Sequence, residues 1–232
     1  MNLKISRRRI IVLILLLAAA GSGGFVFYEN TKVVPDQLLR EALENTFNAQ
    51  SYTFSVKSNL VVDGKQRALS DIEGEKDKEG NYHIKGTMLK QAVEVYQIEN
   101  TTYFKEEKTD KWMVIENNNI MDMEQFITEV NPLSNFNFTI PPNIDYLGKE
   151  EIDGRKCVVL SCMPDVENQI LELHWNNFKY KLWVDKGKKI IRQAEVMAES
   201  KNDSGTTLCL NVELKDTNKG GEISPPEIKK ES

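Results

Sequence analysis

A change in the hydrophobic period after residue 50 most constrains the fold of this chain. Along residues 52–62, Tyr52, Phe54, Val56 and Leu60 alternate with polar residues, and the run ends at an Asp-Gly pair. Successive side chains on a β-strand point to opposite faces, so this period of two predicts a strand that leads into a hairpin. Ten similar runs follow at residues 67–76, 82–90, 92–98, 102–107, 111–116, 145–151, 155–163, 178–185, 188–199 and 206–215. The sequence therefore predicts about eleven antiparallel strands.

Three segments have the period of an α-helix instead. The first begins at Pro35 and Asp36, and its apolar residues fall at helical spacing as far as Phe47. Two shorter helices are expected at residues 122–130 and 165–175, the second with Asp165 as its N-cap. Twist accumulates in a large open sheet, so a sheet of this size curls. We therefore predict an α+β fold in which a strongly curved, unclosed antiparallel sheet, a half-barrel, carries helices on its concave face.

Residues 10–28 form an apolar segment without a charged side chain, directly after a basic stretch that contains Lys4 and Arg7 to Arg9. As a helix this segment would be about 28 Å long, close to the ~30 Å thickness of the hydrocarbon core of a bilayer. The positive charges favour a cytoplasmic N-terminus. The sequence thus predicts a single-pass membrane anchor followed by an extracytoplasmic domain.

A cleaved signal peptide is the alternative for the same segment. Ala18, Ala19 and Ala20 satisfy a small-residue cleavage pattern, and cleavage before Gly21 would release a secreted protein. The cysteine that a lipoprotein signal requires does not follow this run. Both interpretations place the domain outside the cytoplasm.

The chain is expected to contain one folded domain. We divide it into a basic region (1–9), the anchor (10–28), a linker (29–34), the domain (35–216) and a flexible charged tail (217–232). The net charge is −5 for the whole chain and −9 once the four basic residues before the anchor are removed. An acidic surface argues against nucleic acid as a partner.

Three cysteines are present, at positions 157, 162 and 209. Cys157 and Cys162 are five residues apart on one predicted strand, so they point to opposite faces and do not bridge each other. One of them could pair with Cys209 across strands. The alternative is that all three are small apolar residues of the core.

Residues with catalytic potential are few. His83 and His174 are the two histidines, and neither lies in a metal-binding or nucleophile motif. His174 and Glu172 are expected to form a surface pair, and the cysteine spacing does not match a zinc site. We therefore expect a protein that is not an enzyme and that uses no metal or cofactor.

Several short sequences, in their order along the chain, carry a resemblance to a known family. They are Ala49-Gln50-Ser51-Tyr52 after the first helix, Ile152-Asp153-Gly154-Arg155-Lys156 at a hairpin, Leu182-Trp183-Val184-Asp185, and Ile223-Ser224-Pro225-Pro226. Together with the order of helices and strands over residues 35–226, they resemble the lipoprotein-localisation fold. This group includes LolA-type lipoprotein carriers, the mycobacterial LppX and LprG lipoproteins, and RseB-type sensor domains of the bacterial cell envelope.

The resemblance implies a half-barrel whose concave side, covered by helices, holds the acyl chain of a lipid or lipoprotein. A tethered protein cannot diffuse as a carrier does, so local transfer is expected. The alternative function is an RseB-like extracytoplasmic sensor or interaction module that regulates a protein partner at the membrane. Six apolar residues on the inward faces of their elements are the candidates to line the cavity, although they could equally fill a dry core: Phe47, Phe54, Phe126, Ile170, Leu173 and Leu182.

Overall fold

The computed structural model describes residues 33–118 and 131–228. The predicted anchor at 10–28 and the helix predicted at 122–130 lie outside these residues. Within 33–118 and 131–228, no helix is both long and apolar enough to span a bilayer. Residues from Pro35 onward form one compact unit.

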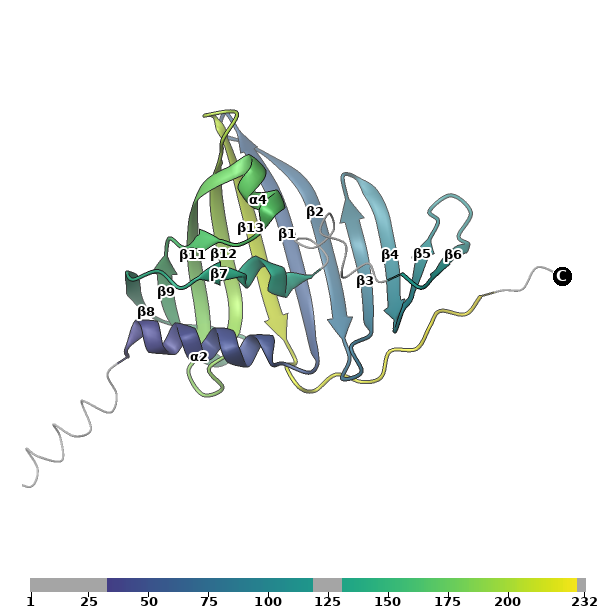
Figure 1. Ribbon diagram of the computed structural model, residues 1–232, viewed down its shortest axis with the longest axis horizontal. Helices are drawn as coiled ribbons and strands as arrows, with labels where there is room; N and C mark the ends of the chain where they lie inside the picture. Colours follow the sequence, from purple (N-terminus) through teal and green to yellow (C-terminus); the bar gives the residue numbers. More distant parts are fainter. Residues whose placement is uncertain (1–32, 119–130, 229–232) are drawn as a thin grey trace, which may run out of the picture. The chain divides into compact units, whose positions relative to one another are not determined.

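An antiparallel sheet of eleven strands dominates this unit (Figure 1). The strand order is β6-β5-β4-β3-β2-β1-β13-β12-β11-β9-β8, and the edge strands β6 and β8 do not pair with each other, so the sheet is unclosed. The strands are β1 (Tyr52–Val62), β2 (Lys65–Lys76), β3 (Tyr82–Met88), β4 (Gln91–Ile98), β5 (Thr101–Lys105), β6 (Trp112–Glu116), β8 (Ile144–Ile152), β9 (Arg155–Cys162), β11 (Trp175–Asp185), β12 (Ile191–Ser200) and β13 (Thr206–Lys215). All eleven overlap with strands predicted from the period of two, although β11 begins at Trp175, inside the helix predicted at 165–175.

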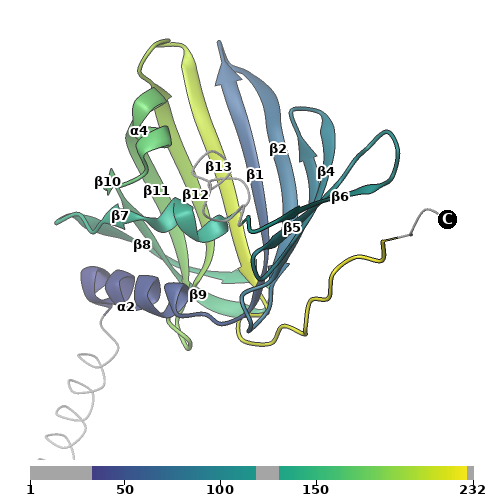
Figure 2. The same cartoon turned by 45° about the vertical axis from the view of Figure 1, so that its right-hand side comes forward.

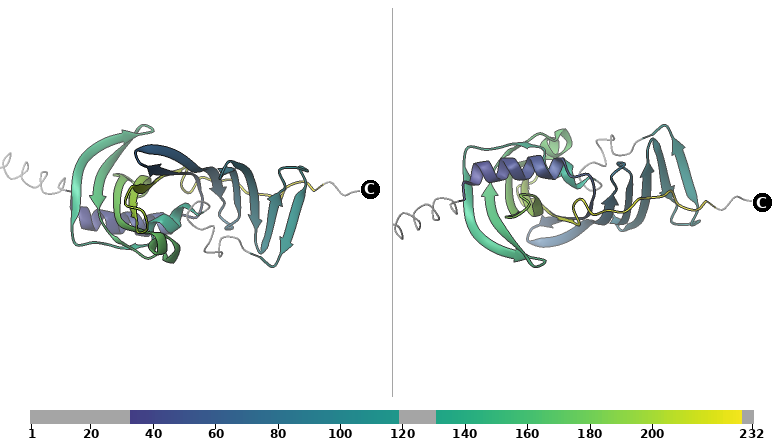
Figure 3. Two further views of the ribbon diagram at one scale, coloured as in Figure 1. Left: turned by 90° about the horizontal axis from the view of Figure 1, so that it is seen from above. Right: turned by 90° about the horizontal axis from the view of Figure 1, so that it is seen from below.

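The first and last strands meet at the centre of the sheet. β1 pairs with β13, the last strand of the chain, in register from Thr53 opposite Lys215 to Val62 opposite Thr206. From β1 the chain runs outward through β6 as a meander, and the second half of the chain builds the other side. Figure 3 shows that the sheet curves strongly at the β8 end, so that helix α2 (Pro35–Phe47) lies within the curve.

The helices gather on one face of the sheet, here called the helix-bearing face (Figure 2). Helix α2 contacts β8 and β12, the 3-10 helix η3 (Pro132–Phe136) contacts β1, and α4 (Gln169–His174) contacts β11. A short ladder of β7 (Phe138–Thr139) with β10 (Asp165–Val166) lies beside them. The described helices therefore cover the half of the sheet that runs from β8 to β1.

Polar anchors fix two of these helices to the sheet. The buried Thr46 of α2 accepts a hydrogen bond from the Ile191 N–H of β12 (3.0 Å) and donates to the Ala42 carbonyl (2.6 Å). On η3, the Asn135 carbonyl accepts from the Tyr180 hydroxyl of β11 (2.9 Å). Because these groups are buried, each bond sets the position of a helix as well as satisfying a polar atom.

The predicted helix at 165–175 is correct in type but wrong at its start. Asp165 belongs to β10, and Asn168 is the cap, since its Oδ1 accepts from the Leu171 N–H (3.0 Å). The backbone of Asp165 is paired with Thr139 of β7, which keeps it out of the helix.

The beginning of the tail, predicted to be flexible over residues 217–232, makes hydrogen bonds to the domain; its flexibility stays a prediction. The Asn218 N–H donates to the Ser51 carbonyl (2.7 Å), and the Gly220 N–H donates to the Ser51 hydroxyl (2.9 Å). Farther on, the Ile223 N–H donates to Asp77 Oδ2 (3.0 Å). The segment thus follows the ends of the strands because its backbone donors find partners there (Figure 1).

The cysteines lie as the strand period predicts. Cys157 packs with Val159 and Trp183 on the face opposite the helices, whereas Cys162 faces Tyr180 on the helix-bearing face. All three cysteines are free, so the pairing with Cys209 that the sequence left open is not formed.

Candidate functional site

A row of aliphatic side chains crosses the helix-bearing face. The strand registers place Leu182, Ala194, Val212, Val56 and Ile72 opposite one another on five neighbouring strands. None of the five is exposed to solvent. This row forms the centre of the core, beneath the described helices and η3.

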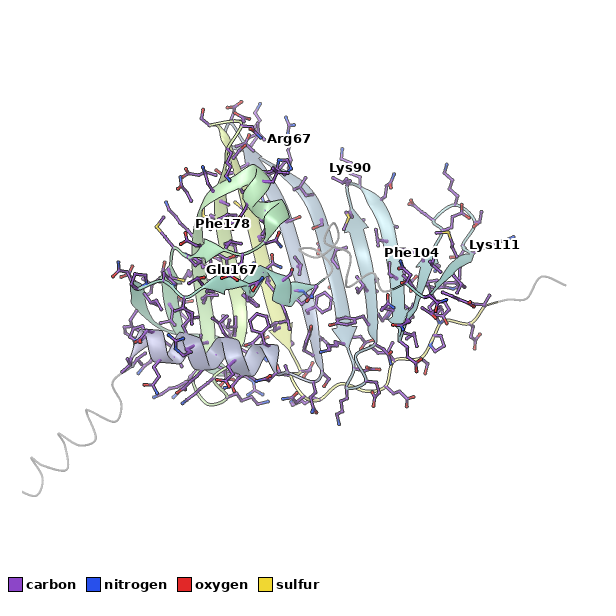
Figure 4. All side chains as sticks on the ribbon, viewed as in Figure 1. Arg67, Lys90, Phe104, Lys111, Glu167 and Phe178 are labelled. Carbon is purple, nitrogen blue, oxygen red and sulfur yellow. The ribbon has the colours of Figure 1, made fainter. Side chains whose placement is uncertain are left out.

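A second row continues beyond the strands that the helices contact. Gly74, Ile84, Val95 and Phe104 lie opposite one another from β2 to β5, and Met113 follows on β6. Ile84 and Val95 are fully buried, Phe104 is half-buried and Met113 is 57% exposed. The apolar face of the sheet therefore extends beyond the area that the described helices cover. Figure 4 labels Phe104 and Phe178, which stand on β5 and β11 on the two sides of β1.

Phe54 begins this second row and lies over a glycine. Its ring atom Cε1 is 2.7 Å from the position that a Cβ on Gly74 would occupy, and its ring is edge-on to Tyr52 at 6.1 Å. A side chain at position 74 would collide with the ring, so glycine is required by this close approach. The ring of Phe54 thereby fills space above β2 that a larger residue would otherwise take.

Polar pairs border the apolar rows on β1 to β5. Along one border the hydroxyls of Ser58 and Ser70 are 2.6 Å apart, and both residues are buried. Along the other border the Thr102 hydroxyl donates to Gln97 Oε1 (2.7 Å), and these residues are also buried. The rows between the two borders form an apolar belt, defined by Phe54, Val56, Ile72, Ile84, Val95 and Phe104.

Two of the predicted lining residues lie on the helix-bearing face. Phe54 is 4% exposed, and Leu182 is fully buried. They stand on β1 and β11, and the sheet brings them to the same side. Contact of either residue with a ligand stays a prediction.

Of the other four predicted lining residues, two are exposed, and the side chains of the remaining two are not covered by the described part of the chain. Phe47 and Leu173 are 45% and 67% exposed. Each stands at or near the last residue of a helix, where the side chain has no following turn to pack it against the sheet. Phe126 lies outside the described residues, as does the side chain of Ile170.

The opposite face of the same strands is polar. Lys57 pairs with Asp71 (3.2 Å), and Lys105 pairs with Glu94 (3.1 Å) and Asp110 (3.0 Å). Hydrogen bonds to Asp110 and Glu94 raise the pKa of the Lys105 ammonium. Two shallow grooves of about 470 and 620 Å³ cross this face, and both are lined by Glu73 and Lys85. Sequence reasoning did not single out these charged positions, because alternating charges are also typical of an ordinary solvated face.

Comparison with known proteins shows likeness in structure. No protein-family model and no curated protein sequence matches the chain. The crystal structure of lipoprotein LppX from Mycobacterium tuberculosis matches with a TM-score of 0.53 at 15% identity, over 82% of this chain and 97% of LppX. LprF from Mycobacterium bovis matches with a TM-score of 0.53 at 14% identity, over 83% of this chain and 96% of LprF. The resemblance seen in the sequence is thus confirmed as a shared architecture: the chain has the same fold as LppX and LprF.

Proposed function

We propose that this protein is an extracytoplasmic domain, tethered to the membrane by residues 10–28, that binds the acyl chain of a lipid or lipoprotein on its apolar belt. The observation that carries the proposal is the continuation of the apolar face past the described helices, from the buried Ile84 and Val95 to the half-buried Phe104 and the exposed Met113. The likeness to lipoprotein LppX supports a place in the cell envelope.

The chemistry of the apolar belt suits an acyl chain. A polymethylene chain is apolar along its whole length, and two parallel rows of aliphatic and aromatic side chains between polar borders match that shape. Burying ten methylenes would contribute about 8 kcal/mol before the entropic cost of binding is subtracted. The proposed role is binding and local transfer, with no catalytic step.

The proposal can be tested with the full chain in liposomes that contain a phospholipid with a photoreactive acyl chain. After illumination, adducts located by mass spectrometry are expected in peptides that contain Ile84, Val95 or Phe104. Phe104→Gln should lower their yield, whereas Tyr103→Gln is the matched control, because its side chain points to the opposite face of β5. Adducts confined to residues 10–28 would show that the domain does not receive acyl chains.

A second candidate function is a sensor or interaction module for a protein partner at the membrane. The charged grooves of the opposite face favour this function. Glu73 and Lys85 line both grooves, and charged side chains of both signs suit contact with a polar protein surface. Cross-linking in cells from Lys57 or Lys85 would discriminate between the two candidates. A stable protein adduct without acyl-chain adducts on the apolar belt would favour the interaction module.

A further inference from the structure

A small basic cavity lies at one end of the sheet, where several strands begin or end. It has a volume of about 280 Å³ and is lined by five basic side chains, those of Arg155, Lys188, Arg192, Lys215 and Lys219. β9 and β12 begin here, β13 ends here, and Lys188 comes from the turn between β11 and β12. Antiparallel pairing brings these positions, which are distant in the sequence, together at one end of the strands.

The charge of this basic cavity is opposite in sign to that of the protein. Two acidic residues, Asp153 and Asp216, also line it. Asp185 pairs with Arg155 (3.5 Å) and Glu213 pairs with Lys215 (3.0 Å). Four carboxylates thus face five basic groups, which leaves an excess of one positive charge in a chain of net charge −5. Asp153 is shared, since its Oδ2 is 3.5 Å from Lys215 Nζ and 4.0 Å from an Arg192 Nη2. Lys188 and Lys219 form no ion pair among the described residues, so the attraction of the cavity for anions rests on these two ammonium groups and on Arg192.

Two buried polar groups in the cavity wall lack a partner. The side chain of Arg192 is 10% exposed, and its Nε has no hydrogen-bond partner among the described residues. Thr217 is 4% exposed, and its hydroxyl also has no hydrogen-bond partner among the described residues. Buried donors are almost always paired with protein groups or water, so these two donors are available to acceptor oxygens in the cavity. The forked donors of a guanidinium match the oxygens of a phosphate or a carboxylate.

We propose that the basic cavity binds a phosphate group. Arg192 and Thr217 donate hydrogen bonds to its oxygens, and the ammonium groups of Lys188 and Lys219 supply the balancing charge. The phosphate has two sources, free inorganic phosphate or the headgroup of an anionic phospholipid. The site is separate from the apolar belt, because Lys215 is in register with Thr53 on the opposite face. It does not depend on the function proposed above.

Isothermal titration calorimetry of the detergent-solubilised full chain tests this proposal. The two probes are inorganic phosphate and glycerophosphoglycerol, which is the headgroup of phosphatidylglycerol without its acyl chains. The ionic strength is kept constant with chloride. Saturable binding of one equivalent is expected, and Arg192→Gln should weaken it about tenfold or more, as expected for the loss of a charge-assisted hydrogen bond.

Two further variants keep the test decisive if Arg192→Gln folds poorly. Lys219 is exposed in the tail segment, so Lys219→Gln should leave the circular dichroism spectrum unchanged and still weaken binding about threefold, since one screened charge contributes less than one buried hydrogen bond. Lys65→Gln, at the other end of the sheet, removes an equal charge and should leave affinity unchanged.

Each outcome has a definite meaning. Tighter binding of glycerophosphoglycerol supports the phosphate site with a lipid headgroup as source, and tighter binding of inorganic phosphate supports it with free phosphate as source. The proposal is overturned if neither probe binds saturably to the folded chain, or if Lys65→Gln weakens binding as much as Lys219→Gln. Acyl-chain adducts on the apolar belt are a separate readout, so failure of one proposal is distinguishable from failure of the other.

Discussion

The ring of Phe54 lies against the Cα position of Gly74 on the neighbouring strand. A Cβ at Gly74 would be 2.7 Å from Phe54 Cε1 and 3.0 Å from the His83 carbonyl oxygen. Such approaches are well inside van der Waals contact. The pair joins the central strand β1 to β2 and β3 at the start of the apolar belt, and both the stability of the sheet and the width of the belt depend on it.

Replacing Gly74 by alanine is therefore expected to destabilise the fold. The added methyl group must displace a buried ring, which costs about 1–3 kcal/mol of the free energy of unfolding. Urea unfolding followed by tryptophan fluorescence measures the change. Gly221→Ala is the control, because nothing lies within 4 Å of the added Cβ there. Shortening the ring with Phe54→Leu in the Gly74→Ala background should recover part of the loss, and a full additive loss would contradict the proposed collision.

The buried hydroxyl pair of Ser58 and Ser70 should behave as a unit. Ser70→Ala leaves the Ser58 hydroxyl without its partner in a buried position, at an expected cost of about 1–3 kcal/mol in the free energy of unfolding. The double variant Ser58→Ala/Ser70→Ala should lose much less than the sum of the single changes. A double-mutant cycle measures this coupling, with Ser161→Ala on the opposite face of β9 as a neutral comparison. Additive losses would mean that the two hydroxyls do not interact.

Asp77 should make the stability of the domain sensitive to acid. Burial acts to raise the pKa of this carboxyl, but hydrogen bonds from Ile223 and Asn81 outweigh it and hold the pKa below the ordinary value of 3.8. A depressed folded pKa stabilises the fold above pH 3.8, and this contribution is lost as the pH falls through the lower folded value.

We expect Asp77→Asn to lower the free energy of unfolding by about 1–3 kcal/mol at pH 7 and to reduce its fall between pH 5 and about 3. Urea midpoints across this range measure the effect, and Asp145→Asn, an exposed carboxyl on β8, is the control. If Asp77→Asn and the unchanged chain lose stability equally on acidification, the carboxyl does not anchor the tail segment as described.

The three thiols are expected to differ in reactivity. Burial raises the pKa of Cys162 to about 12 and also raises the pKa of Cys157. Burial also raises the pKa of Cys209, but this side chain is only partly buried and is therefore the thiol that a reagent can reach. At pH 8, Ellman's reagent should therefore modify one thiol in the folded protein and three after denaturation, because the thiolate is the reactive form. Cys209→Ser should abolish the reaction of the folded state, and rapid labelling of Cys162 would argue against its burial.

The strands were predictable because their signal is local. Alternation along β1, from Tyr52 to Val62, predicts which side chains share a face of the sheet. The same period places Cys157 and Cys162 of β9 on opposite faces. The start of α4 was not predictable in this way. Asp165 and Asn168 are both good caps, and pairing of Asp165 with Thr139, a residue 26 positions earlier in the sequence, decided between them.

The candidate sites depended more heavily on tertiary structure. Of the predicted lining residues, Phe54 and Leu182 reach the helix-bearing face, whereas Phe47 and Leu173 are exposed at helix ends. The basic cavity was invisible in the sequence, because Arg155, Arg192 and Lys219 lie far apart along the chain and each resembles an ordinary surface residue.

By itself the sequence determined the eleven strands of the main sheet, the face of their side chains and the α+β class, since hydrophobic period and turn residues act over a few neighbours. The tertiary structure alone decided that β1 pairs with β13, that the tail bonds to Ser51 and Asp77, and that five basic side chains converge at one end of the sheet. These features arise from contacts between residues more than a hundred positions apart or scattered over several strands. Their stability depends on which polar and apolar surfaces are buried together in the fold. A pattern of neighbouring residues does not predict these long-range contacts.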